Sequence, residues 1–320
     1  MSGWPLRSGF PGLNRRTTMA TRPATKAIVQ ALVVTFLWST SWVLIKLGLR
    51  ASLPAVTFAG LRYSLAFLCL VPFVLFNPTH RATLRALPGS VWVGLALLGV
   101  VFYALTQGAQ FVGLSFLPAA TLTLLLNLSP IVVALLGLLL TVERPTRGQW
   151  GGILLSAAGA LVYFTPLALP AGQVIGLAVG LLGLLANAAS ALLGRQINRD
   201  GRLSPLLVTT VSMGVGGLLL LVTGAATQGF GRLGPAQWLL VAWLAVVNTA
   251  LAFTLWNHTL RTLTAVESSV INNTMLPQIA ILAWVFLDEP LNLRQIIGIG
   301  LVGVGTLVVQ LRRAAPRAAR

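Results

Sequence analysis

Residues 129–160 read SPIVVALLGLLLTVERPTRGQWGGILLSAAGA, and this stretch decides the fold. An apolar segment that begins at Pro130 leads into a short charged turn at Glu143, and a second apolar segment runs on to Gly159. The same design returns near the C-terminus, so the chain contains an internal duplication. A shift of 146 residues superposes Glu143 on Glu289, Gly152 on Gly298 and Gly159 on Gly305, and a shift of 147 superposes Pro130 on Pro277.

The composition places the chain in the membrane. Hydrophobic residues make up 56% of the 320 residues and charged residues only 8%, whereas a soluble domain carries about a quarter charged residues. Apolar runs of roughly 20 residues, the length that crosses a bilayer core as a helix, recur from Lys26 to Arg312. We therefore predict an all-α integral membrane protein with ten transmembrane helices. The predicted spans are 27–49, 55–76, 89–112, 117–141, 148–166, 173–194, 204–224, 236–258, 263–287 and 293–311.

The placement of the positive charge predicts the orientation of the chain. The formal net charge is +17. With the N-terminus in the cytoplasm, 17 of the 22 Lys and Arg residues fall in cytoplasmic segments and three, Arg50, Arg232 and Arg294, fall outside. This bias is what the positive-inside rule describes. It predicts a multi-pass protein of the cytoplasmic (inner) membrane with both termini in the cytoplasm. Since membrane orientation accounts for the positive charge, no nucleic-acid partner is predicted.

A duplicated unit of five crossings has a further implication. Because five is odd, the second copy enters the membrane upside down, and the two halves are predicted to be inverted repeats. The repeats are expected at 27–166 and 173–311, flanked by basic cytoplasmic tails at 1–26, expected to be disordered, and 312–320. Met1 and Met19 both remain open as the true start.

Polar residues form stripes on several of these apolar spans. Thr35, Ser39, Trp42 and Lys46 fall on one helical face, which should point into the bundle because lipid tolerates polar groups poorly. Lys46 has two interpretations: its ammonium snorkels to the nearby interface, or it binds an anionic group of a solute. Amides hold solutes well because they both donate and accept hydrogen bonds. The residues predicted to contact a solute, with the two tryptophans as apolar walls, are Ser39, Trp42, Lys46, Tyr103, Gln107, Asn127, Asn187, Asn273 and Trp284.

Other intramembrane polar or helix-breaking residues are expected to be structural. Arg62 is interpreted first as a residue that pairs with an acid, Asp288 or Glu289, or with carbonyls, and second as a solute contact. Pro130 and Pro277 each free a backbone carbonyl, which predicts either a shared hinge or a static kink filled by neighbouring side chains.

The remaining acids of this group lie in or just before predicted helix caps. Thr264 and Glu267 have the spacing of a capping box, with proton coupling by Glu267 as the alternative. Thr146 with Gln149, and Asn292 with Gln295, have the same spacing after the turns at Glu143 and Glu289, so these turns are predicted to start supporting helices.

Four segments of the chain resemble a known family. The segments WSTSWVLIKLGL (38–49), GLRYSLAFL (60–68) and LSPIVVALLGLLLTVERPTRGQWGGILLSAAGALV (128–162) resemble the EamA-type repeat of the drug/metabolite transporter superfamily. LPQIAILAWVFLDEPLNLRQIIGIGLVGVGTLVV (276–309) resembles the second copy of that repeat. The resemblance covers about 27–311 and implies a ten-helix transporter of small solutes, with a central cavity between the repeats and the cargo left open.

These observations favour a transporter over an enzyme. The sequence has two His, one Cys and five acids, which form no familiar metal set, and it has no P-loop pattern, so no cofactor is predicted. We expect a secondary transporter, an exporter of small metabolites such as amino acids or related solutes, that works by alternating access. The expected partners are the solute and the lipid bilayer; a monomer and a homodimer both remain open, as does the coupling ion. The alternative is a membrane-embedded enzyme that acts on a lipid-type substrate.

Overall fold

A computed structural model describes residues 21–139, 146–165, 171–198, 203–259, 262–263 and 271–313. Within these ranges the chain is helical and contains no strand. The elements are α1 (Thr21–Arg50), α2 (Ala55–Leu75), α3 (Pro78–Ala86), α4 (Gly89–Leu98), η1 (Gly99–Gln107), α5 (Gly108–Phe116), α6 (Ala119–Leu126), α7 (Ser129–Leu139), α8 (Arg147–Phe164), α9 (Ala171–Asn198), α10 (Pro205–Thr227), α11 (Pro235–Ala245), η2 (Val246–Leu251), α12 (Ala252–Thr259), α14 (Met275–Leu287) and α15 (Leu293–Arg313).

Length and apolar composition make these helices membrane spans. Six stretches of the described chain are long and apolar enough to cross a bilayer, and they are Thr25–Arg50, Ala55–Leu75, Gly89–Phe116, Gly172–Gly194, Pro205–Thr227 and Pro235–Trp256. Shorter apolar helices lie at Ala119–Val133, Ile271–Leu287 and Leu293–Val309. The prediction of an all-α, multi-pass membrane protein is confirmed. The count of ten spans stays a prediction.

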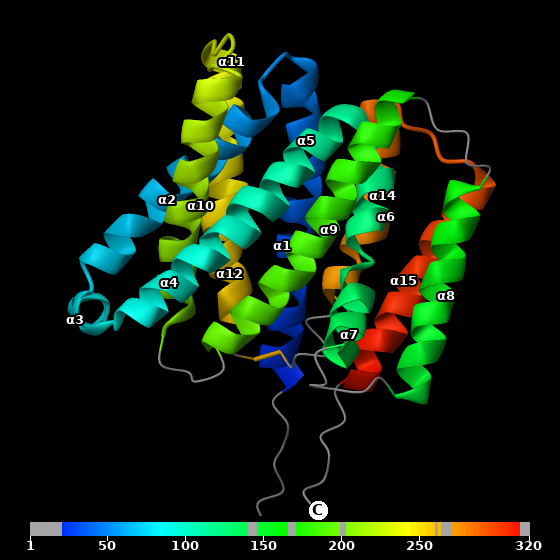
Figure 1. Ribbon diagram of the computed structural model, residues 1–320, viewed down its shortest axis with the longest axis horizontal. Helices are drawn as coiled ribbons and strands as arrows, with labels where there is room; N and C mark the ends of the chain where they lie inside the picture. Colours follow the sequence, from blue (N-terminus) through cyan, green and yellow to red (C-terminus); the bar gives the residue numbers. More distant parts are fainter. Residues whose placement is uncertain are drawn as a thin grey trace, which may run out of the picture.

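Helices from the two halves of the chain pack against one another (Figure 1). α1 runs through the middle of the view and packs against α14, α12 and α5, while α9 packs against α5, η1, α6 and α7. α2 lies along α10. The start of α1 and the end of α15 lie at the same, lower end of Figure 1, and α1 finishes at the upper end. Helices from both halves therefore interleave around the centre.

α8 and α15 form a closely packed pair at one edge of the molecule (Figure 1). A methyl group added at Gly152 would come within 2.7 Å of the Gly305 carbonyl oxygen, and one added at Gly159 within 2.7 Å of Leu301. Two backbones approach this closely only where side chains are absent. The glycine pairs at the predicted spacing are thus contact residues of supporting helices, as the sequence indicated.

The predicted capping boxes start these two helices. The Thr146 hydroxyl accepts from the backbone N–H of Gln149, whose side chain accepts from the Thr146 N–H at 2.8 Å. Asn292 and Gln295 make the same reciprocal pair at the start of α15. Each box satisfies N–H groups that the first helical turn leaves without carbonyl partners.

The predicted span 117–141 is broken where Pro130 approaches. α6 ends before Asn127, and α7 begins at Ser129. Proline cannot donate to the carbonyl four residues earlier, that of Leu126, and the Ser129 hydroxyl donates to this oxygen instead at 2.7 Å. α14 begins at Met275, two residues before Pro277 and directly after a turn at Thr274. Both predicted proline sites therefore interrupt a helix, and the freed Leu126 carbonyl has a partner.

Two π-helical turns and one short helix were not predicted. η1 begins at Gly99 and η2 at Val246, 147 residues apart. Thr106 donates to the carbonyl of Val101, and Thr249 donates to that of Leu244, each five residues earlier. Wide turns of this kind recur at functional sites. The short helix is α3, which Asn77 caps through the backbone N–H groups of the first turn, with Pro78 at its first position.

Candidate functional site: a central polar cavity

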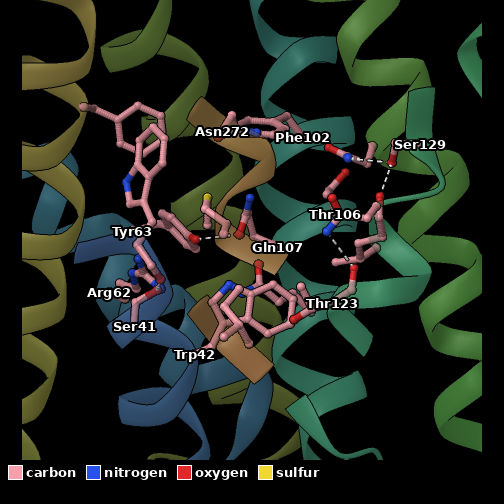
Figure 2. A pocket seen from close by; sticks show the side chains of 18 of the residues that line it. Ser41, Trp42, Arg62, Tyr63, Phe102, Thr106, Gln107, Thr123, Ser129 and Asn272 are labelled. Carbon is pink, nitrogen blue, oxygen red and sulfur yellow. Dashed lines mark hydrogen bonds between the residues drawn. The ribbon is translucent and has the colours of Figure 1, made fainter. Parts of the chain in front are cut away.

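A cavity of about 360 Å³ lies between the two halves of the chain (Figure 2). This volume is at the small end of the range for ligand pockets. Its wall contains one charged side chain, several aromatic rings and a set of amides and hydroxyls. The lining residues are Trp38, Ser41, Trp42, Arg62, Tyr63, Phe102, Thr106, Gln107, Gln110, Thr123, Leu126, Asn127, Ser129, Pro130, Asn187, Phe253, Asn272, Met275 and Ile279.

One wall carries Arg62 and Tyr63, which α2 presents together (Figure 2). The Arg62 Nε donates to the hydroxyl of Thr249 at 3.0 Å, and its Cζ lies 5.2 Å from the centre of the Tyr63 ring. The Tyr63 hydroxyl donates to Gln107 Oε1 at 2.7 Å. Arg62 does not pair with Asp288 or Glu289, so the predicted partners were wrong. Thr249 takes their place.

The opposite wall is built around the break between α6 and α7 (Figure 2). The side-chain amide of Asn187 on α9 donates to Ser129 Oγ at 2.8 Å, and that of Asn127 donates to the Thr123 carbonyl at 3.0 Å. The interrupted helix thus brings polar side chains and backbone to membrane depth. Irregular backbone is tolerated there only where protein or a cavity covers it.

The structure brings several of the predicted site residues together. Trp42 is 7% exposed and forms part of the cavity wall. Gln107, Asn127 and Asn187 line the same space. Pro130 and Arg62, predicted as structural residues, also line it.

Other predicted contact residues lie elsewhere. Ser39 is fully buried against α14, and its hydroxyl lies 2.9 Å from Gln278 Oε1. Tyr103 packs against the rings of Tyr63 and Phe102, one layer behind the wall. Asn273 adjoins the lining residue Asn272.

Trp284 lies outside the cavity as well. It is 61% exposed on the outer surface of α14. A tryptophan suits a lipid-facing surface as well as a cavity wall, because both environments accept its apolar ring. Its prediction as an apolar wall of the cavity is therefore not supported.

Sequence reasoning missed several further wall residues, among them Trp38, Ser41, Tyr63 and Phe253. Trp38 precedes Trp42 by four residues and so shares its helical face, a signal that was available. Its ring lies 5.3 Å from that of Phe253 on α12, a contact between residues distant in sequence. Nothing local in the sequence indicates it.

Lys46 and Glu289 belong to a polar cluster beyond one end of the cavity. The Lys46 ammonium donates to the carbonyls of Leu114 and Leu117 and lies 3.7 Å from Glu289 Oε1. The Ala119 N–H donates to Glu289 Oε2 at 2.7 Å. Both charged side chains are only 12–13% exposed. Lys46 therefore neither snorkels to water nor lines the cavity.

We call Lys46, Arg50 and Glu289 the latch. Arg50 donates to the carbonyl of Leu287 at 2.7 Å, so the three residues join α1 to the ends of α5 and α14 and to the start of α6. Lys46 lies one helical turn beyond Trp42, towards the upper end of α1 in Figure 1. Burial raises the pKa of the Glu289 carboxyl above its ordinary value, and the Ala119 N–H and Lys46 oppose this shift. The latch therefore joins these helices one turn of α1 beyond the lining residue Trp42.

Two predicted structural residues lie outside the described residues. Glu143 lies within residues 140–145, and Glu267 lies within residues 264–270. Their predicted roles, a turn at Glu143 and a helix cap at Glu267, stay predictions.

The comparison with known families decides what kind of protein this is. The model of the EamA-like transporter family matches residues 25–165 and again residues 174–311. The chain belongs to the EamA-like transporter family. The resemblance of the quoted segments to this family is thereby confirmed.

Related proteins of this EamA-like chain carry transporter names. The uncharacterized transporter YyaM of Bacillus subtilis is 24% identical over 78% of this chain and 82% of its own length. The uncharacterized transporter YvbV of the same organism is 26% identical over 93% of this chain and 95% of its own length. A protein of Chlamydia trachomatis named S-adenosylmethionine/S-adenosylhomocysteine transporter is 26% identical over 88% of each chain.

A solved structure shares the fold of this EamA-like chain. A crystal structure superposes with a TM-score of 0.63 at 19% identity, and the match covers 90% of this chain and 98% of the other.

Proposed function

We propose that this EamA-like protein is a secondary transporter that carries a small organic metabolite across the cytoplasmic membrane by alternating access. The observation that carries the proposal is the central cavity. It lies between helices from both halves of the chain, it is lined by amides, hydroxyls and aromatic rings, and the latch joins the helices beyond one end of it. Polar groups at membrane depth are unfavourable unless they serve a solute or water pathway.

The architecture that we propose for this transport is two inverted five-helix repeats, 27–166 and 173–311, with both termini in the cytoplasm. The helix interruptions before Pro130 and Pro277 give each half a point about which it can bend. The latch then releases when the site turns to the other side. At the opposite end, Gln30 joins α1 to α12 through His258 and the Leu255 carbonyl.

We propose export as the net direction. The positive-inside distribution puts the start of α1 in the cytoplasm, so the latch closes the external end and the site is loaded from inside. The relatives with transporter names support a metabolite as cargo, and one of them is named for S-adenosylmethionine and S-adenosylhomocysteine. The cavity volume of about 360 Å³ suits solutes of the size of amino acids and related compounds.

A transport measurement tests the proposal. The purified protein is reconstituted into liposomes that are loaded with a metabolite mixture, and release is followed by mass spectrometry beside protein-free liposomes. We expect release of particular solutes only with the protein. Failure of every solute in a broad panel to move through folded, inserted protein contradicts the proposal.

Two tryptophans provide a matched pair for this assay. Trp42 lines the cavity, whereas Trp284 is 61% exposed on the outside. Trp42→Ala should lower the transport rate at limiting solute roughly 10-fold or more, as removal of a buried aromatic contact does. Trp284→Ala should stay within about twofold of the parent, because it contacts no solute. Equal effects of the two changes argue that the cavity is not the transport site.

A further inference from the structure

Arg62 is a buried cation without an anionic partner. The residue is only 4% exposed, and its Nε donates to Thr249. In the parts of the chain that the structure describes, this is its one hydrogen bond, and the ion pair found there joins Lys46 to Glu289 instead. The rings of Tyr63 and Phe111, 5.2 and 5.9 Å from its Cζ, add only cation–π attraction.

The unpaired part of the guanidinium opens onto the cavity. Its two terminal nitrogens carry four N–H donors. They are not sealed inside protein, because the buried, unpartnered polar atoms of the described chain are Ser64 Oγ, His80 Nδ1, Thr210 Oγ1 and Asn248 Oδ1. Arg62 itself lines the cavity. Because Arg62 lines the cavity and these nitrogens have no hydrogen-bond partner among the described residues, a molecule bound in the cavity can accept from them.

The surroundings hold this cation in one orientation. The Thr249 hydroxyl donates to the Leu244 carbonyl at 2.8 Å, which leaves its oxygen free to accept from Arg62 Nε. Thr249 lies in the π-helical turn η2, and Leu244 lies at the end of α11. A guanidinium fixed at Nε presents its terminal pair of nitrogens as a fork, the geometry that binds two oxygens of one anionic group.

The charge balance of the cavity selects the anion. Arg62 is the one charged side chain among the described lining residues. A singly charged anion neutralises the single positive charge of this buried wall, whereas a phosphate dianion would leave one negative charge without a partner. The aromatic rings of Trp42 and Phe102, which line the same cavity, suit a planar or apolar body.

We infer that Arg62 is the anion-binding subsite of this cavity, and that the transported solute is an organic carboxylate with a planar or apolar body. The inference rests on the proposed function and specifies its substrate class. The carboxylate oxygens accept from the terminal N–H groups of Arg62, and the body lies against the aromatic wall.

A binding experiment tests this inference without transport. The full chain in detergent is titrated with a panel of aromatic and aliphatic carboxylates, amino acids among them, each beside its own carboxamide and beside a phosphate monoester of similar size. Dissociation constants are measured by calorimetry and thermal stabilisation. We expect at least one carboxylate to bind about 10- to 100-fold more tightly than its carboxamide, as expected for charge-assisted hydrogen bonds.

Variants assign this difference to one residue. Arg62→Gln should remove the preference for carboxylate over carboxamide, and Arg62→Lys should keep only part of it because an ammonium lacks the fork. Thr249→Val retains the charge but removes the oxygen that accepts from Arg62 Nε, so it should weaken carboxylate binding. This variant tests the inference even if Arg62→Gln fails to fold. Arg232→Gln removes an equal charge from an exposed position and should change nothing.

The outcomes separate the two proposals. Equal binding of every carboxylate and its carboxamide, an unchanged preference in Arg62→Gln, or tighter binding of the phosphate esters overturns the inference, even if liposomes show transport. An Arg62-dependent carboxylate preference without solute movement across liposomes supports the inference and overturns the proposed function.

Discussion

Replacing Lys46 with methionine tests the latch, because the change removes the ammonium group and retains an unbranched side chain. In the parent, this group makes two bonds to carbonyls and lies 3.7 Å from the Glu289 carboxylate. In an effective dielectric of about 20, charges at this distance attract by about 4 kcal/mol. The regained hydration of both groups offsets part of this attraction.

The net effect on the closed latch should therefore be about 2 kcal/mol. A change of this size shifts the balance between closed and open forms roughly 30-fold towards open. Glu289→Gln alone should have little effect, because the amide oxygen still accepts from Ala119 N–H. In the Glu289→Gln background, Lys46→Met should lose about 1 kcal/mol of its effect, the coupling energy of the pair.

Thiol accessibility measures the open fraction. Cys69 is the one cysteine in the sequence, so a Cys69→Ala background with Ser41→Cys carries a single reporter thiol in the cavity wall. A membrane-impermeant thiol reagent is added at the latch side of oriented vesicles. Lys46→Met should raise the labelling rate roughly 30-fold, in proportion to the open fraction.

Arg294→Met provides the control, because it removes an equal charge at the same end from an exposed side chain. An unchanged labelling rate in Lys46→Met refutes the latch. An equal rise in Arg294→Met refutes it too, since the effect then follows from net charge alone.

Three further predictions concern stability and pH. Gly159→Leu should lower the stability of the folded protein by about 3 kcal/mol or more, because even one added carbon meets α15 at 2.7 Å. The control is Gly151→Ala, whose added carbon meets nothing within 4 Å. It should leave the thermal unfolding temperature in detergent unchanged or raise it. Thr146→Ala should cost about 1 kcal/mol by removing the cap of α8, and urea unfolding followed by circular dichroism measures this loss. The third prediction follows from the raised pKa of the Glu289 carboxyl in the closed latch. At a pH between the ordinary pKa and this raised pKa, Glu289 is protonated in the closed form and ionised in the hydrated, open form. Opening then releases a proton, so rising pH favours opening. Labelling of the cavity thiol from the latch side, corrected for thiolate content, should therefore increase across that window, and an increase that persists in Glu289→Gln assigns the effect to another group.

Local sequence patterns predicted the parts of this structure that depend on neighbouring residues. The capping boxes at Thr146 and Asn292 and the glycine spacing of α8 and α15 require only a few consecutive turns, and the structure contains them. The broken helix before Pro130 was predictable for the same reason, since proline removes one specific hydrogen bond.

Residues whose role depends on distant contacts were harder to place. Lys46 was expected at the interface or in the cavity, but its partners are backbone carbonyls about 70 positions away, which no side-chain pattern reveals. Tyr103 and Gln107 lie four residues apart and were both predicted to contact a solute, yet both belong to the wide turn of η1, and of these two only Gln107 lines the cavity. Trp42 and Trp284 look alike in sequence because lipid and a cavity wall both accept an indole ring.

The α8–α15 pair also sets the order in which the protein is assembled. The backbones meet through Gly152 and Gly305, so α8 must stay in the membrane without its partner while the whole second half is synthesised. At translation rates of about 5–20 residues per second, this wait lasts roughly 8–30 s. Docking of α15 onto α8 therefore comes only after the second half of the chain has been made. A ribosome that stops before residue 293 releases a chain whose α8 glycines remain open to lipid or to another protein.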